Sequence, residues 1–82
     1  MLKKEYDLDA RGLLCPLPVL KARKRLAGMN PGEILKITAT DPAARIDLPH
    51  YCSEAGHRFL GEYREGDAWV FRIERKDGTD VE

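Results

Sequence analysis

Proline and glycine residues divide this chain of 82 residues into short segments, and that division limits what the chain can fold into. Gly12 ends the first apolar segment, and residues 28–32 (GMNPG) end the second. Both residue types are disfavoured inside helices and strands, so the stretches between them set the lengths of the elements. A chain of this length holds one hydrophobic core, and we predict a single domain over 1–76 followed by a loose polar tail, 77–82.

The first two segments have different apolar periods. Residues 3–9 (KKEYDLD) alternate apolar and charged side chains, which predicts a short half-buried strand. Residues 16–27 predict a helix, because apolar residues recur there and just beyond it at helical spacing: Val19, Ala22, Leu26 and Met29. Pro16 and Pro18 fit its first turn, where backbone N–H groups have no intrahelical partner.

In the middle of the chain, a predicted strand is again followed by a predicted helix. Residues 33–40 (EILKITAT) are rich in β-branched and apolar side chains and predict a strand. Asp41 followed by Pro42 is typical of a helix start. Asp47 and Pro49 predict that this second helix breaks and restarts before it ends near residue 55.

Two further strands are expected in the last third. Residues 57–63 (HRFLGEY) and 68–75 (AWVFRIER) have strand composition, and residues 64–67 (REGD) predict a tight hairpin between them. The order is then β-α-β-α-β-β. It predicts an α+β fold, a two-layer α/β sandwich in which a mixed four-stranded sheet carries both helices on one face.

Charge and hydropathy exclude some classes of protein. Fourteen basic residues balance fourteen acidic ones, whereas general nucleic-acid binders usually carry basic excess. No apolar run reaches the roughly 18 residues that a membrane span needs. The first ten residues contain acids where a signal peptide has an apolar stretch, so we expect a cytoplasmic protein. We also expect a monomer.

Cys15 is the residue with the most chemical interest. It directly precedes Pro16, at the predicted start of the first helix. Unpaired N–H groups and the helix dipole favour an anion at that end and can lower the pKa of a thiol, which favours a reactive thiolate. Cysteine is also a common small core residue. The local sequence leaves the reactive and the packing interpretations open.

A longer motif surrounds this cysteine. Residues 8–18 read LDARGLLCPLP, in which a Leu-Asp pair, a glycine and a Cys-Pro-x-Pro run lead into the first helix. This pattern resembles the signature of the TusA/SirA-like sulfur-carrier family. The resemblance continues through 31–33 (PGE), 34–42 (ILKITATDP) and 47–49 (DLP), and covers roughly residues 6–75.

The resemblance implies the same β-α-β-α-β-β sandwich and a function. In this family the cysteine matched by Cys15 accepts sulfane sulfur as a persulfide and passes it to an acceptor protein. Donors are cysteine desulfurases or rhodanese-type sulfurtransferases. Destinations are tRNA thiolation, molybdenum cofactor synthesis or sulfur oxidation. We therefore expect a sulfurtransferase-type carrier without a cofactor and without direct nucleic-acid contact, the alternative being a non-catalytic RNA- or protein-binding regulatory module.

Residues around the cysteine are assigned supporting roles. Asp9, Gly12, Pro16 and Pro18 are expected to support the loop that carries it. Lys21, Arg23 and Lys24, with Arg25 beside them, form a basic run on the first helix. That run is either a solvated face or a surface for docking partner proteins. Leu13, Leu14 and Leu17 are candidates for an apolar collar around the thiol.

The other candidate residues favour structural roles. Cys52 is expected to be a partly buried structural residue, with an auxiliary thiol as the alternative. His50, Cys52 and His57, taken with the distant Cys15, do not have the spacing of a compact zinc site, so no metal is expected. Asp47 is expected to cap the restarted helix. The alternation of Trp69, Phe71 and Ile73 predicts a core face, although exposed aromatic residues on a sheet can also stack on RNA bases.

Overall fold

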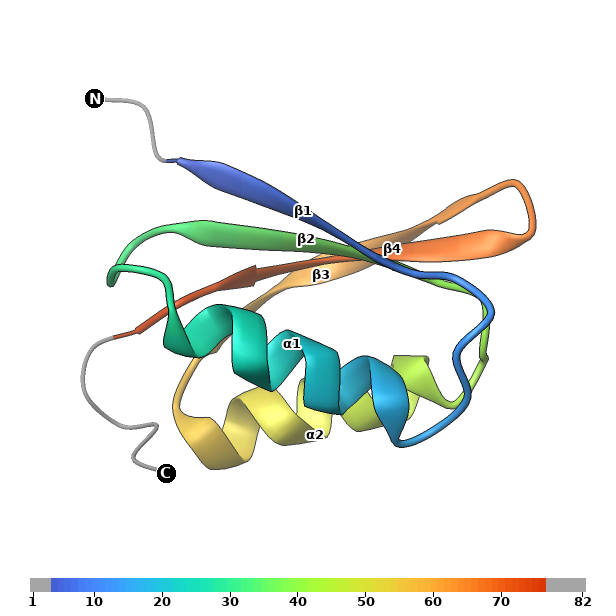
Figure 1. Ribbon diagram of the computed structural model, residues 1–82, viewed down its shortest axis with the longest axis horizontal. Helices are drawn as coiled ribbons and strands as arrows, with labels where there is room; N and C mark the ends of the chain where they lie inside the picture. Colours follow the sequence, from blue (N-terminus) through green and yellow to red (C-terminus); the bar gives the residue numbers. More distant parts are fainter. Residues whose placement is uncertain (1–3, 77–82) are drawn as a thin grey trace.

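The computed structural model describes residues 4–76, so the predicted tail, 77–82, lies outside the described residues. Four strands and two helices follow the predicted order: β1 (Glu5–Ala10), α1 (Leu17–Ala27), β2 (Ile34–Ala39), α2 (Ala44–Ala55), β3 (Arg58–Glu65) and β4 (Ala68–Glu74). Both helices lie side by side on one face of the sheet (Figure 1). The predicted two-layer α+β fold is confirmed.

The sheet has the order β1-β2-β4-β3. β1 and β2 are parallel, with α1 as the connection between them, while β4 is antiparallel to both β2 and β3. The sheet is therefore mixed, as predicted. Gly66 begins the two-residue turn between β3 and β4 at a φ of 63°, a conformation that glycine adopts without steric cost.

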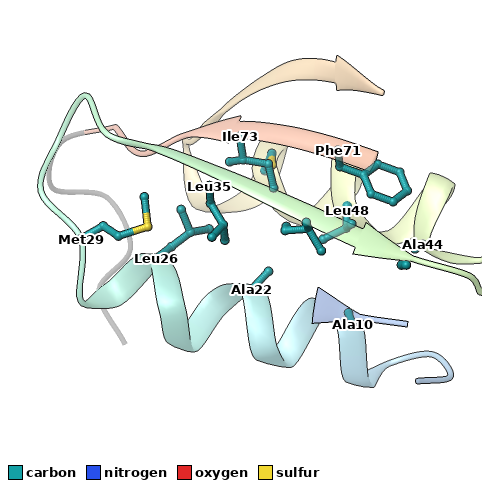
Figure 2. Close-up of a cluster of buried hydrophobic side chains, with 12 residues drawn as sticks. Ala10, Ala22, Leu26, Met29, Leu35, Ala44, Leu48, Phe71 and Ile73 are labelled. Atoms are coloured by element: carbon teal, nitrogen blue, oxygen red, sulfur yellow. The ribbon is translucent and has the colours of Figure 1, made fainter. Parts of the chain in front are cut away.

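The core lies between the sheet and the helices, where apolar side chains from both layers meet (Figure 2). From α1 the predicted residues Ala22 and Leu26 are fully buried, and Met29 follows just beyond the helix end. Val19, the fourth residue of that predicted face, is only half-buried. In β4, Phe71 and Ile73 have no exposed surface, which confirms their predicted place in the core.

Trp69 differs from Phe71 and Ile73 on the same strand, because cationic side chains lie over its ring. Its ring is half-buried, and the guanidinium groups of Arg45 and Arg64 lie 5.5 and 4.6 Å from its centroid. These are cation–π distances. Two arginine side chains therefore lie over the aromatic ring that stacking on an RNA base would need.

The predicted break in the second helix is wrong. α2 runs without interruption from Ala44 to Ala55 and contains Pro49 in its interior. The residues buried against the core are Ala44, Leu48, Cys52 and Ala55, spaced as one helical face. Packing of this face offsets the hydrogen bond that a proline removes, so tertiary contacts override the local signal. Gly56 ends the helix at a φ of 84°, as expected.

No helix within residues 4–76 has the length and apolar character needed to cross a membrane.

Candidate functional site

The loop between β1 and α1 presents Cys15. Its first turn is ordered by Asp9, whose carboxylate accepts hydrogen bonds from the backbone N–H of Arg11 at 3.0 Å and from Arg11 Nε at 3.1 Å. Gly12 follows at a φ of 80°, and its N–H donates to Thr40 Oγ1 at 3.0 Å. The loop is thus tied to the end of β2 before the chain reaches the cysteine.

The start of α1 differs by one residue from the prediction. Pro16 occupies the N-cap position, Leu17 is the first helical residue, and Pro18 lies in the first turn. Cys15 therefore lies just outside the helix, and its peptide bond to Pro16 is cis. Its side chain is exposed and its thiol is free.

A second loop holds the cysteine from the other side. The backbone N–H of Cys15 donates to Asp41 Oδ2 at 2.7 Å, while Asp41 Oδ1 accepts the N–H of Ala43 at 3.1 Å. These two hydrogen bonds lower the pKa of the Asp41 carboxyl. Because β1 and β2 are parallel, the loops that follow them leave the same edge of the sheet. Asp41 uses that proximity to fix the backbone of Cys15.

The position before a helix does not lower the pKa of Cys15, because that pKa is raised. The largest cause is a hydrogen bond with the Asp47 side chain, followed by partial desolvation and by the negative charges of Asp47 and Asp41. Carboxylates next to a thiol disfavour its anion. In the isolated protein these two acids therefore favour the protonated thiol over the thiolate.

The prediction that Asp47 caps a restarted helix is wrong, because α2 has no break. Asp47 lies in the first turn of a continuous helix rather than at the cap of a restarted one. It lines a shallow cavity of about 240 Å³ between the two helices, together with Cys15, Pro16, Val19, His50, Tyr51 and Glu54. The thiol and a carboxylate from the opposite helix therefore share one small cavity.

Apolar side chains are exposed next to Cys15 and next to Asp47 in the sequence. Leu14 is 69% exposed and Leu17 is 46% exposed, whereas Leu13 is half-buried and packs on the core. Ile46, which precedes Asp47 on α2, is 75% exposed. We call Leu14, Leu17 and Ile46 the apolar rim. Of the predicted collar, Leu14 and Leu17 point to solvent and Leu13 does not.

The basic run on α1 divides between two faces of the helix. Lys21, Arg23 and Lys24 are all exposed. Arg23 is four residues beyond Val19, which lines the cavity of Cys15, so these two side chains share a face. Lys21 and Lys24 instead line a separate groove against β1. Only Arg23 of the predicted docking residues is aligned with the cysteine along the helix.

The remaining candidate residues are Cys52, His50 and His57, and of these three His50 lines the cavity of Cys15. Cys52 is 1% exposed, and burial raises its pKa to about 12, in keeping with a structural role. His50 is exposed and pairs with Glu54 at 3.3 Å. His57 is buried, and its Nδ1 accepts the N–H of Lys76 at 3.2 Å. Within residues 4–76 no cluster of three or more His, Cys, Asp or Glu side chains could hold a metal ion.

The sequence interpretation missed the importance of Thr40, Asp41 and Asp47 around the thiol. A signal for two of them was present. A parallel β-α-β pair places the residues that follow both strands at one edge of the sheet, and Thr40 and Asp41 directly follow β2. Asp47 has no such signal, because its approach to Cys15 depends on the unbroken course of α2.

Comparison with known proteins places this geometry in a family. The family model described as "Sulfurtransferase TusA" matches residues 6–75. The sulfur carrier protein TusA of Pseudomonas entomophila is 41% identical over 72 residues, which are 88% of this chain and 90% of that protein. The Bacillus subtilis protein YrkF is 42% identical over 67 residues, which are 82% of this chain but only 36% of YrkF.

A solved structure shares the fold. The SirA-like protein of Desulfitobacterium hafniense superposes with a TM-score of 0.77 over 88% of this chain and 99% of that one, at 22% identity. It supports the architecture, while the sequence matches carry the family assignment. This chain belongs to the TusA family of sulfurtransferases.

Proposed function

We propose that this protein is a sulfur-relay protein, in which Cys15 accepts sulfane sulfur as a persulfide and transfers it to an acceptor protein. The observation that carries the proposal is an exposed, free thiol on a loop fixed by Asp9, Thr40 and Asp41. A carrier needs a sulfur atom that a partner can reach and a backbone that presents it reproducibly. The names of the relatives support the same role.

Loading is a displacement at sulfur and needs no external oxidant. The Cys15 thiolate attacks the terminal, sulfane sulfur of a donor persulfide and forms a new S–S bond. The donor's own S–S bond breaks, and its electron pair leaves with the donor thiolate, which takes up the proton that Cys15 gives up. Cys15 becomes a persulfide, and transfer to an acceptor repeats the same exchange with Cys15 as the leaving thiolate.

The acidic side chains near the thiol make its reactivity depend on a bound partner. Asp47 and Asp41 disfavour a negative charge on the sulfur in the isolated protein. A persulfide anion at the same place experiences the same repulsion. A partner that brings a cation to this cavity stabilises the anion and promotes reaction, so the thiol is least reactive when no partner is bound.

Partner proteins fit the surface better than a small substrate does. The cavity beside the thiol is shallow, and the apolar rim exposes side chains that a protein surface can cover. Arg23 adds a positive charge on the cavity side of α1, which suits an acidic patch on the partner. The supporting roles of Asp9, Gly12, Pro16 and Pro18 and the docking roles of Lys21, Arg23 and Lys24 belong to this proposal.

The proposed donors are a cysteine desulfurase or a rhodanese-type sulfurtransferase, and the acceptor is a downstream protein in tRNA thiolation, molybdenum cofactor synthesis or sulfur oxidation. The carrier acts as a cytoplasmic monomer, with no cofactor and no direct contact with nucleic acid.

A discharge experiment tests the relay. The protein is incubated with a rhodanese-type enzyme and thiosulfate, separated from the donor, and treated with cyanide, which removes sulfane sulfur as thiocyanate. We expect one thiocyanate per chain for the wild type and for Cys52→Ala, and none for Cys15→Ser. Equal release from Cys15→Ser would disprove the proposal. A non-catalytic regulatory module predicts that Cys15→Ser keeps its activity in cells.

A further inference from the structure

A second cavity lies on the opposite flank of α1 from Cys15. It has a volume of about 420 Å³ and runs between α1 and the edge strand β1. We call it the β1–α1 groove, and it is lined by Tyr6, Leu8, Lys21, Lys24, Arg25, Gly28 and Met29. None of these residues lines the cavity of Cys15. The helix therefore separates the groove from the thiol.

The cations of the groove form one face of α1. Lys24, Arg25 and Gly28 follow Lys21 by three, four and seven residues, the spacing of a single helical stripe. Arg23 is rotated by roughly 200° from Lys21 at 100° per residue and lies off this stripe. The helix thus presents three positive charges to the groove and a fourth to the side of Cys15.

These three cations have no ion-pair partner within residues 4–76. Arg25 makes a cation–π contact with Tyr6, its guanidinium carbon lying 4.9 Å from the ring centroid. This contact does not neutralise the positive charge of the guanidinium. Asp9 is close enough to Lys21 for their charges to interact, but Arg11 holds that carboxylate through three hydrogen bonds. None of the groove-lining residues is acidic.

Two acids of β1, Glu5 and Asp7, are turned away from the groove. Side chains alternate along a strand, so Tyr6 and Leu8 face the helices while Glu5 and Asp7 face the other side. There Glu5 pairs with Arg72 at 2.8 Å and Asp7 with Lys36 at 3.9 Å. The charge of the groove is therefore positive on balance, over an apolar floor.

The position of β1 adds a third property. Among residues 4–76, β1 pairs only with β2, so no strand in this range lies along the outer edge of its backbone. An extended peptide can add to such an edge through backbone hydrogen bonds. Its alternate side chains then fall on the Leu8 and Met29 side, within reach of Lys21 and Lys24.

From these observations we propose that the β1–α1 groove docks an extended acidic peptide segment of a partner protein, in which acidic and apolar side chains alternate. The backbone of the segment pairs with β1. Because side chains alternate along a strand, its carboxylates all point to the groove side and meet Lys21, Lys24 and Arg25, with their methylene groups over the apolar floor, while its apolar side chains point to the opposite face. A partner held there leaves the Cys15 cavity uncovered. The carrier can therefore be recognised and its sulfur reached at the same time, and docking does not depend on persulfide chemistry.

A peptide titration tests this docking site. The probe is a short synthetic peptide in which glutamate alternates with valine, added at low salt to the isotope-labelled protein, with backbone amide signals followed by NMR. We expect shifts in β1 and in residues 21–28 of α1. The double variant Lys21→Glu/Lys24→Glu should bind on the order of tenfold more weakly. The matched control, Arg58→Glu/Arg64→Glu on the far edge strand β3, should bind as the wild type does.

Several results would overturn the site. Equal loss in both double variants would mean that only overall charge matters, and equal binding of a lysine–valine peptide would remove charge complementarity. Octyl sulfate has an anionic head and an apolar tail but no peptide backbone. If it binds the groove more tightly than the peptide and leaves β1 unshifted, the occupant is a small amphiphile. Sulfur loading of the wild-type protein by a small polysulfide should be equally fast with and without the bound peptide, which separates this test from that of Cys15.

Discussion

The backbone N–H of Cys15 donates to Asp41 Oδ2 at 2.7 Å across 26 positions of the sequence. This bond joins the loops that follow two parallel strands, so the fold itself places the thiol. The bond also lowers the pKa of Asp41. Because the folded-state pKa lies below the unfolded value of about 3.9, the stabilisation is present above that pH and is lost as pH falls through the folded-state pKa.

Replacing Asp41 should loosen the loop without unfolding the domain. Asp41→Ala removes the acceptors for the N–H groups of Cys15 and Ala43, and we expect faster amide hydrogen exchange over residues 12–17 with little change in β4. In the wild type, the amide shifts of Cys15 and Ala43 should titrate together in acid, below the ordinary aspartate range. Separate transitions, or unchanged exchange in the variant, would contradict the linkage.

Neutralising Asp47 should make the thiol more reactive. The carboxylate raises the pKa of Cys15, so Asp47→Asn lowers that pKa and increases the thiolate fraction at neutral pH. Alkylation of Cys15 by iodoacetamide at pH 7 should be severalfold faster than in the wild type, and the two rates should converge at high pH. Asp7→Asn is the control, because Asp7 pairs with Lys36 on the outer face of the sheet. An unchanged pH profile in Asp47→Asn would rule out this role.

The order of the elements could be predicted because each depends on a local pattern. The alternation around Tyr6 and the apolar spacing of Ala22 and Leu26 are visible in the sequence alone, and both led to the observed elements. The course of α2 could not be predicted locally, because Pro49 is a strong breaker signal and only the burial of Leu48 and Cys52 overrides it.

The direction of the pKa shift at Cys15 could not be predicted locally, for a related reason. The position of Cys15 before a helix favours a lowered pKa, but the acids that reverse the shift come from elsewhere in the chain. Asp41 approaches through the pairing of β1 with β2, and Asp47 through the packing of α2 beside α1. The sequence around Cys15 therefore indicates the start of the helix and its dipole, but it does not indicate which carboxylates the fold brings to the thiol.

Cys52 should matter for stability and not for sulfur transfer. Its side chain is almost fully buried, so Cys52→Ser places a hydroxyl in the core and should lower the free energy of unfolding by about 1–3 kcal/mol. Chemical denaturation measures this change. Cys52→Ala should load sulfur on Cys15 as the wild type does, and a loss of loading in that variant would make Cys52 part of the chemistry.

The apolar rim should matter for partners and not for the fold. Leu14→Ser and Ile46→Ser alter exposed side chains, and each should change the free energy of unfolding by within about 0.5 kcal/mol. Sulfur transfer from a persulfidated donor protein should be severalfold slower, because the covered apolar area is smaller, while loading by a small polysulfide stays normal. Leu60→Ser on β3 is the matched control. Equal slowing in Leu60→Ser, or slower loading by polysulfide, would argue against a docking role.

The most direct measurement is mass spectrometry of tryptic peptides after incubation with a sulfane-sulfur donor and blocking of free thiols. Cleavage after Arg11 and Lys21 isolates Cys15 in the peptide 12–21, and cleavage after Arg45 and Arg58 isolates Cys52 in 46–58. The account predicts that the peptide 12–21 gains the mass of one sulfur atom and that 46–58 gains none. Sulfur found only on 46–58, or equal uptake by Cys15→Ser, would contradict it.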